Sequence, residues 1–191
     1  MFSVSKLIST FFYVGFSKIC PGTFGSIATL PLWFFICFCL SKLDIIDNSK
    51  VLLAILLFIL AFIYIIGTIA TKIYMEETKK SDPSEVVIDE VVGQLIAFIM
   101  SSALLYTHAE KITAIMNCEC QYLKNGLTLL LMITPIIFFR FFDILKPYPI
   151  GYIDKHMDNA HGVMLDDVVA GIFGGFCNVG LIYLFLSMVK L

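Results

Sequence analysis

The segment that decides the fold is VLLAILLFILAFIYIIGTIA, residues 51–70, which contains twenty residues and no charged side chain. A helix rises about 1.5 Å per residue, so this segment is long enough to cross the roughly 30 Å hydrocarbon core of a bilayer. The whole chain has the same bias, since 59% of its 191 residues are hydrophobic and 15% are charged. An ordinary soluble domain is about 45–50% apolar and about 25% charged. The sequence therefore predicts a membrane protein.

Four other apolar segments are weaker candidates for membrane spans. They are residues 26–40, 89–106, 126–142 and 166–189. We predict an all-α fold, a polytopic membrane helical bundle of about five spans, in which residues 1–191 form a single membrane-embedded domain. Residues 1–17 carry Phe11, Phe12 and Tyr13 and are predicted to form an interfacial helix at the level of the lipid headgroups.

The lysine and arginine residues of the connections predict the orientation. With five spans, the N-terminus and the connections 71–88 and 141–165 lie on one side of the membrane. That side, with Arg140 at its edge, holds eight of the thirteen Lys and Arg residues, and the other side holds five. Cytoplasmic connections are enriched in Lys and Arg, so this side is predicted to be cytoplasmic. All the motifs described below fall on it.

Two similar stretches each place a pair of acids at the start of an apolar helix. They are VIDEVVGQLIAF, residues 87–98, and MLDDVVAGIFGGF, residues 164–176. A single carboxylate there is an ordinary helix cap, which the helix dipole stabilises by roughly 0.3–1 kcal/mol. If Asp89 and Glu90 face Asp166 and Asp167, each close pair repels by about 4 kcal/mol at an effective dielectric constant of 20. Simple capping is the alternative, and a bound divalent cation is the interpretation we favour.

The residue types around these acids indicate which cation they hold. Hard carboxylate oxygens, with no His or Cys beside them in the sequence, suit Mg²⁺ or Ca²⁺ rather than zinc. Gly93 follows Asp89 by four residues and Gly171 follows Asp167 by four, so each glycine shares a helix face with an acid. Small residues let membrane helices approach closely, which predicts that the two helices bring their acids together.

A cation lies close to an acid after the fourth predicted span. Asp143 and Lys146 are followed by Pro147 and Pro149, which restrict the direction of the chain. A lysine held beside a metal site suits a phosphate group, so Lys146 is a candidate phosphate-binding residue. A surface ion pair between Asp143 and Lys146, worth little to stability, is the alternative.

The stretch SKICPGTFGS, residues 17–26, offers a second set of phosphate-binding groups before the first predicted span. It contains Lys18, Thr23 and Ser26 around a Pro-Gly turn that leads into a helix. Exposed N–H groups at a helix start, hydroxyls and a cation together favour an anion. The same pattern is also a common way to begin a helix.

Other features weaken alternative interpretations. A net charge of −2 without a basic block does not favour binding of nucleic acid. The six cysteines have neither disulfide nor zinc-site spacing, and they are predicted to be free thiols that pack as small hydrophobes. His156 and His161 lie on the motif side, where a solvated loop histidine is favoured over a general acid or base.

The motifs together resemble the phosphatidylglycerophosphatase A family. The stretches that carry the resemblance are PGTFGS at 21–26, DPSEVVIDEVVGQ at 82–94, RFFDILKPYPI at 140–150 and GVMLDDVVAG at 162–171. The resemblance implies an all-helical, magnesium-dependent phosphatase that converts phosphatidylglycerophosphate to phosphatidylglycerol in a bacterial inner membrane. Cys20 stands where the family usually has Ala, and DNAHG at 158–162 replaces a glycine-containing approach, so no role for His161 is carried over.

We therefore expect metal-assisted hydrolysis of a phosphate monoester on a phospholipid, with Mg²⁺ as the cofactor. The predicted metal ligands are Asp89, Glu90, Asp166 and Asp167. The predicted catalytic residues are Asp143, Asp167 and Lys146, and the predicted phosphate-binding residues are Lys18, Thr23, Ser26 and Lys146. A covalent aspartyl-phosphate route is a variant of this chemistry.

Three alternatives stay open at this point. A phosphatase for another membrane-lipid phosphate would have the same chemistry. A CDP-alcohol phosphotransferase also uses acids and Mg²⁺ at the membrane edge, but its D-x-x-D-G pattern is absent from this sequence. A cation transport protein would place its acids near the bilayer midplane, whereas these acids lie at one end of their helices.

Overall fold

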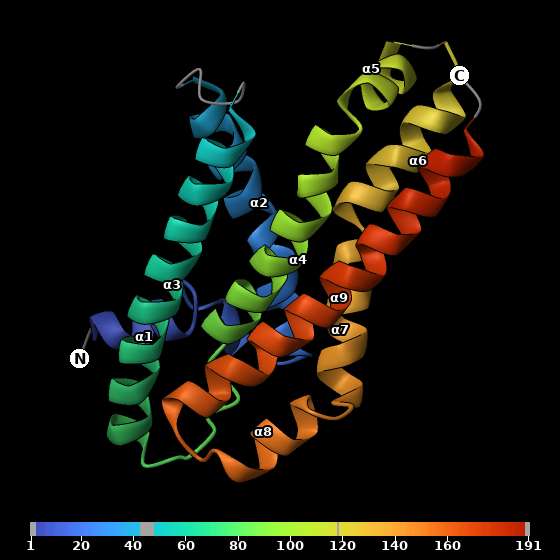
Figure 1. The fold of residues 1–191 in the computed structure, drawn as a ribbon. Helices are drawn as coiled ribbons and strands as arrows, with labels where there is room; N and C mark the ends of the chain where they lie inside the picture. Colours follow the sequence, from blue (N-terminus) through green and yellow to red (C-terminus); the bar gives the residue numbers. More distant parts are fainter. Residues whose placement is uncertain (1–2, 43–47, 118, 190–191) are drawn as a thin grey trace.

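A computed structural model of the protein describes residues 3–42, 48–117 and 119–189 (Figure 1). The elements in chain order are α1 (Val4–Ser9), the 3₁₀ turn η1 (Val14–Phe16), α2 (Pro21–Lys42), α3 (Ser49–Thr78), α4 (Ile88–Thr107), α5 (Ala109–Asn117), α6 (Gln121–Met132), α7 (Thr134–Leu145), α8 (Ile150–His156) and α9 (Ala160–Met188). The described residues contain no strand, so the predicted all-α fold is confirmed.

Four helical segments of the described chain are long and apolar enough to cross a membrane. They are Pro21–Lys42, Ser49–Thr78, Gln121–Leu145 and Ala160–Met188. The remaining predicted span is α4, a helix of 20 residues. Its residues 91–99 are all buried, because α4 packs against α2, α3, α7 and α9. A helix that is apolar on all sides is expected at the centre of a bundle, and α4 lies there in Figure 1.

The α4–α9 pair has the close approach that the glycine spacing predicts. A Cβ atom added to Gly171 would lie 2.2 Å from the carbonyl oxygen of Gly93. One added to Gly93 would lie 2.5 Å from the carbonyl oxygen of Asp167. Neither position has room for a side chain, so the two backbones are in direct contact. This contact brings the first turn of α4 next to the acid pair of α9.

The fourth predicted span consists of two helices, α6 and α7, that meet at Ile133. Pro135 follows this junction and lacks the N–H group that a continuous helix would need. Asn178 of α9, which is fully buried, donates to the carbonyl oxygen of Leu130 at 3.0 Å and to Ser101 Oγ of α4 at 2.8 Å. The side chain therefore ties the break between α6 and α7 to the rest of the bundle.

The N-terminal helix is shorter than the predicted interfacial helix over residues 1–17. Helix α1 ends at Ser9 and packs on α3. Phe11, Phe12 and Tyr13 then adopt left-handed backbone angles, with φ of 42°, 55° and 67°, which end a helix for residues other than glycine. Phe12 and Tyr13 stay exposed, as expected of side chains at the headgroup level.

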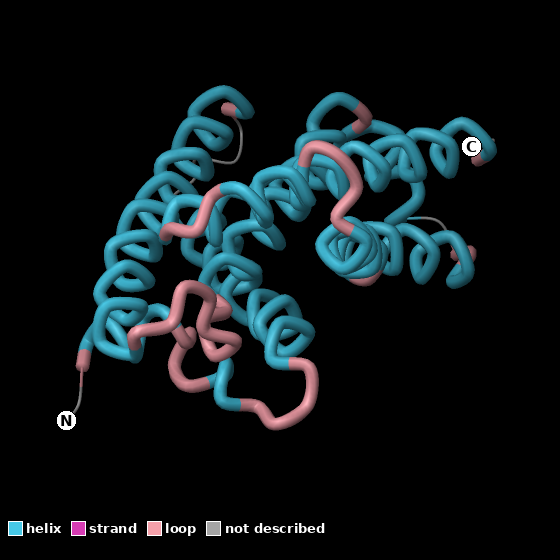
Figure 2. Tube along the Cα trace, turned by 90° about the horizontal axis from the view of Figure 1, so that it is seen from below, coloured by secondary structure: helices cyan, strands magenta, loops and turns pink. Residues whose placement is uncertain are grey.

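The polar connections gather at one end of the bundle. Helices α2, α4 and α9 begin at this end, α3 and α7 finish there, and α8 lies across it (Figure 1). Figure 2, which looks at the bundle from below, shows the loops collected on this face. Cys20, Cys37, Cys39 and Cys177 form no disulfide. This polar end of the bundle contains the candidate site.

Candidate active site

A polar cavity of about 450 Å³ opens at this end of the bundle. It is lined by the start of α2, the α3–α4 loop, the start of α4, the end of α7, α8 and the start of α9. Its charged lining residues, within the described chain, are Asp82, Asp89, Glu90, Arg140, Asp143, Lys146, Asp154, Asp158, Asp166 and Asp167. Eight carboxylates thus share the cavity with two cations. Four stretches that are far apart in the sequence meet in one strongly acidic site.

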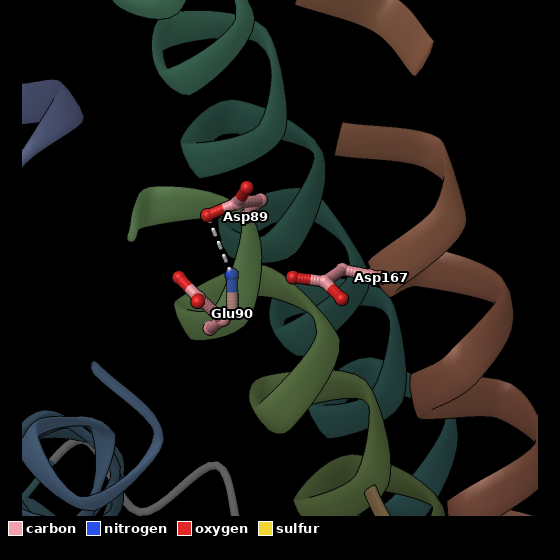
Figure 3. A group of neighbouring side chains, drawn as sticks. All are labelled: Asp89, Glu90 and Asp167. Atoms are coloured by element: carbon pink, nitrogen blue, oxygen red, sulfur yellow. Dashed lines mark hydrogen bonds between the residues drawn. The ribbon is translucent and has the colours of Figure 1, made fainter. Parts of the chain in front are cut away.

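Three of the acids converge on a single point. Asp89, Glu90 and Asp167 each offer a carboxylate oxygen, and the three oxygens lie within 4.8 Å of one another. Figure 3 shows the side chain of Asp167 reaching from α9 toward the first turn of α4. Asp89 and Asp167 are almost fully buried, with 8% and 4% of their surface exposed. The Gly93–Gly171 contact one turn further along makes this convergence possible.

The three-acid cluster fits a hard divalent cation. Burying carboxylates together is costly, because each loses its hydration and repels the others. Asp89 Oδ1 accepts a hydrogen bond of 3.0 Å from the backbone N–H of Glu90, but Glu90 Oε2 is buried without any hydrogen-bond partner. An oxygen-only donor set with an unpaired buried oxygen suits Mg²⁺ or Ca²⁺. The cluster therefore has both the chemistry and the vacant acceptor that such a cation requires.

The fourth predicted metal ligand, Asp166, is not in the three-acid cluster. Its Oδ2 accepts a hydrogen bond of 2.9 Å from Lys146 Nζ, while Asp154 Oδ1 of α8 lies 2.5 Å from the same nitrogen. Burial lowers the pKa of the Lys146 ammonium, but the hydrogen bonds to Asp154 and Asp166 outweigh it, so the pKa lies above its usual range. Lys146 is thus a fixed, permanently charged cation at the cavity.

Asp143, a predicted catalytic residue, is paired with an arginine rather than with Lys146. Its Oδ2 lies 2.6 Å from Arg140 Nη1, and the same nitrogen lies 3.9 Å from Glu90 Oε1. Asp143 is i+3 from Arg140 on α7, so both side chains reach the cavity from one helix face. The ion pair considered between Asp143 and Lys146 does not form.

The predicted phosphate-binding residues of the N-terminal motif are only partly at the site. Thr23 lines the cavity, whereas Lys18 and Ser26 do not. Ser26 is fully buried, and its hydroxyl donates to the carbonyl oxygen of Gly22 at 3.0 Å. Lys18 is exposed in the segment that precedes α2. Phosphate-binding roles for Lys18 and Ser26 therefore have no support in this geometry.

The two histidines on this side lie outside the cavity lining. His161 Nδ1 lies 3.4 Å from the Tyr64 hydroxyl. His156 stacks on Tyr152 with ring centroids 4.1 Å apart, and its Nδ1 lies 2.8 Å from the Tyr152 carbonyl oxygen. Both side chains are exposed, as expected of solvated histidines, but they lie on α8 and α9 rather than in a loop.

Sequence reasoning missed four of the ten charged residues that line the cavity, Asp82, Arg140, Asp154 and Asp158, and two of these, Arg140 and Asp154, form ion pairs there. For Arg140 a signal existed, since a charged residue inside an apolar segment is a functional candidate by default. For Asp154 no comparable signal existed, because it lies in a polar connection among other charged residues. Only the placement of α8 across the end of the bundle brings Asp154 to Lys146.

The fold and the cavity define a class of protein, an all-helical membrane protein with a carboxylate-rich polar site at one end of its bundle. The model of the phosphatidylglycerophosphatase A family matches residues 7–182 of the chain. The chain therefore belongs to the phosphatidylglycerophosphatase A family, and it is a phosphatase.

Individual relatives agree with this assignment. The chain is 29% identical over 167 residues to a phosphatidylglycerophosphatase A of Haemophilus influenzae, which covers 87% of this chain and 82% of that protein. It is 26% identical over 177 residues to the phosphatidylglycerophosphatase A of Escherichia coli, and the match covers 93% of this chain and 80% of that protein. A Bacteroides thetaiotaomicron protein, provisionally named phosphatidylinositol-3-phosphatase, is 30% identical over 167 residues, and the match covers 87% of this chain and 86% of that protein. No solved structure matches the chain.

Proposed function

We propose that the protein hydrolyses phosphatidylglycerophosphate to phosphatidylglycerol and phosphate, with Mg²⁺ as its cofactor. The observation that carries this proposal is the convergence of Asp89, Glu90 and Asp167 in a cavity that also presents Lys146. The family and two of the relatives bear the name of this activity. The reaction would serve the synthesis of phosphatidylglycerol and cardiolipin.

The charge of the cavity supports the requirement for a divalent cation. A phosphate monoester is an anion, and the described lining sets eight carboxylates against two cations. Asp89, Glu90 and Asp167 would hold Mg²⁺, with Asp166 as a candidate for a further ligand or for the orientation of Lys146. When bound, the cation neutralises negative charge on the phosphoryl group and makes a nearby water a better nucleophile.

The chain's own residues bind the substrate and move the proton. Lys146, held by Asp154 and Asp166, donates to a phosphoryl oxygen and stabilises the charge that develops in the transition state. Thr23 offers a hydroxyl to the same group. Asp143 accepts the proton of the attacking water or acts as a further ligand. In the variant with a covalent intermediate, Asp167 or Asp143 would be the nucleophile.

The position of the cavity supports a substrate that stays in the bilayer. The long apolar helices α2, α7 and α9 have one end at the polar end of the bundle (Figure 1), where their residues line the cavity, so acyl chains can lie beside the bundle while the headgroup enters the polar end. The Lys and Arg bias of this end favours the cytoplasmic side. We propose a multi-pass protein of a bacterial inner membrane with its active site on the cytoplasmic face.

The test is release of phosphate from a panel of lipid phosphates, with and without Mg²⁺. The panel contains phosphatidylglycerophosphate, phosphatidic acid and phosphatidylinositol 3-phosphate, because one relative is provisionally named for the last headgroup. We expect Mg²⁺-dependent release, fastest from phosphatidylglycerophosphate. Faster release from another lipid would reassign the headgroup. Cation flux into liposomes without phosphate release would mean that the protein is a transporter.

A further inference from the structure

We propose that Arg140 is a positioning residue that holds Glu90 and Asp143 in the arrangement required by the bound cation, an inference that rests on the proposed function. Arg140 Nη1 lies 2.6 Å from Asp143 Oδ2 and 3.9 Å from Glu90 Oε1. Both contacts are ion pairs rather than hydrogen bonds, because Arg140 Nη1 is buried without a hydrogen-bond partner. The two acids belong to α7 and α4, so one guanidinium connects both helices at the cavity.

The burial of this group makes its geometry consequential. The side chains of Arg140, Glu90 and Asp143 are 17%, 14% and 15% exposed. Little water screens these charges. Without the guanidinium of Arg140 between them, the carboxylates of Glu90 and Asp143 would repel each other. A guanidinium presents several donors in a rigid plane, whereas a lysine ammonium is a point charge on a flexible stem. The rigid guanidinium can therefore keep its charge in a fixed position beside both carboxylates.

The two oxygens of Glu90 have different surroundings. Oε1 is the atom close to Arg140, while Oε2 is buried and has no hydrogen-bond partner. The ion pair therefore takes one oxygen and leaves the other for the cation that Asp89 and Asp167 share with it. In this arrangement Arg140 acts through Glu90, without touching the substrate.

The start of helix α2 packs against the ion pair of Arg140 and Glu90. A Cβ atom on Gly22 would lie 2.2 Å from Glu90 Oε1 and 2.9 Å from Arg140 Nη1. The backbone of the first turn of α2 is thus pressed against the ion pair, and any side chain at Gly22 would displace the carboxylate. We assign to the Pro-Gly-Thr turn this packing role, in which Gly22 limits where Glu90 can go.

The experiment uses Arg140→Lys, because it keeps the charge and removes only the planar group. Purified protein in detergent is titrated with Mg²⁺ by calorimetry without lipid, and steady-state kinetics are measured separately. Loss of groups that orient metal ligands typically weakens metal binding or activity about 10–100-fold. We expect a dissociation constant for Mg²⁺ raised by about ten-fold or more, a lower kcat, and a KM for the lipid within about two-fold.

Gly22→Ala is the second variant, since its added Cβ would lie 2.2 Å from Glu90 Oε1 and 2.9 Å from Arg140 Nη1, which displaces the ion pair while the guanidinium itself is kept. It should show the same pattern, and it decides the matter if Arg140→Lys does not fold. Gly180→Ala on α9 is the matched control, because nothing lies within 4 Å of the added Cβ, and it should bind Mg²⁺ like the parent protein.

Two results would overturn the proposal. Normal Mg²⁺ binding and normal kcat in both variants would mean that the guanidinium geometry is not used. Normal Mg²⁺ binding with a raised KM and weaker inhibition by inorganic phosphate would mean that Arg140, whose Nε has no partner, binds the phosphoryl group directly. A parent protein that binds Mg²⁺ but releases phosphate from no lipid would contradict the proposed function alone.

Discussion

Gly93 and Gly171 lie backbone to backbone across α4 and α9, so close that a Cβ atom on Gly171 would be 2.2 Å from the Gly93 carbonyl oxygen. Both glycines are one turn away from acids of the candidate site. The contact is made by main-chain atoms, which cannot move aside as the end of a flexible side chain can. The separation of the helices therefore sets the separation of Asp89 and Asp167.

Substitution of Gly171 by alanine should consequently loosen both the bundle and the site. Alanine is intrinsically better in a helix by roughly 1 kcal/mol, but overpacking of this kind typically costs about 1–3 kcal/mol. We expect a net loss of thermal stability in detergent and a clear loss of activity. Gly180→Ala, where the added methyl group meets nothing, should be neutral or stabilising. Equal stability of the two variants would contradict the close contact.

The three-acid cluster predicts a specific response to charge removal. Asp89→Asn and Asp167→Asn keep size and polarity, and Asn still caps a helix. If the acids hold a cation, each variant should lose at least about 100-fold in kcat and need more Mg²⁺. The double variant should be little worse than either single one, because residues that act as a unit are not additive. Unchanged Mg²⁺ dependence in both single variants would leave capping as the explanation.

The same variants, which should lower kcat, should raise the stability of the metal-free protein. Without Mg²⁺, removal of one charge from the buried cluster relieves repulsion, so the metal-free variants should unfold at a higher temperature than the metal-free parent. Asp82→Asn is the control, since Asp82 lines the cavity but is exposed in the α3–α4 loop. It should change neither activity nor stability appreciably.

The ion pairs of Lys146 predict how the stability of the protein depends on pH on the alkaline side. Its pKa is raised in the folded protein, so the stability these pairs contribute is complete below the unfolded pKa of about 10.4. That contribution is lost only as pH rises through the folded value. We therefore expect no loss of thermal stability from deprotonation of Lys146 below about pH 10. Between neutral pH and about pH 10, the melting temperature of the parent protein and that of Lys146→Arg, which stays charged throughout, should change with pH in the same way. A fall in the melting temperature of the parent protein near about pH 9 that is absent from Lys146→Arg would show that Lys146 loses its proton below about pH 10 and would contradict the prediction.

The arrangement of the polar end predicts a labelling pattern across the membrane. In a cysteine-free background, single cysteines at Ser84 and Asn159, both exposed, should react with an impermeant maleimide from the same side. A cysteine at Tyr122, which is 89% exposed at the start of α6, should react from the opposite side. Reaction of Ser84 and Asn159 positions from different sides would contradict the shared polar face.

Much of this architecture could be predicted from the sequence, for identifiable reasons. Apolar length alone locates membrane helices, and α3 extends over the segment 51–70 from which the fold was predicted. The spacing of Gly93 and Gly171 from the acids could be interpreted because residues four apart share a helix face. Four of the ten charged cavity residues, Asp89, Glu90, Asp166 and Asp167, stand out as pairs in otherwise apolar surroundings.

The remainder depends on contacts between distant segments, which a local pattern does not contain. The sequence places Lys146 near Asp143, but the ammonium bonds to Asp154 and Asp166 instead. Similarly, the Pro-Gly-Thr motif looks like an anion cradle by composition, although Gly22 meets Glu90 and Arg140. The direction in which each side chain points is decided by the packing of α2, α7 and α8 around α4.

The order of the helices along the chain has a consequence for biosynthesis. Asp89 and Glu90 enter the bilayer at the start of α4, whereas Asp167 belongs to α9, the last helix of the described chain. A growing polypeptide therefore inserts its earlier helices before the repulsive acid cluster exists. The electrostatic cost of the site arises only when α9 docks against α4, at a stage when the surrounding helices are already in place to oppose it.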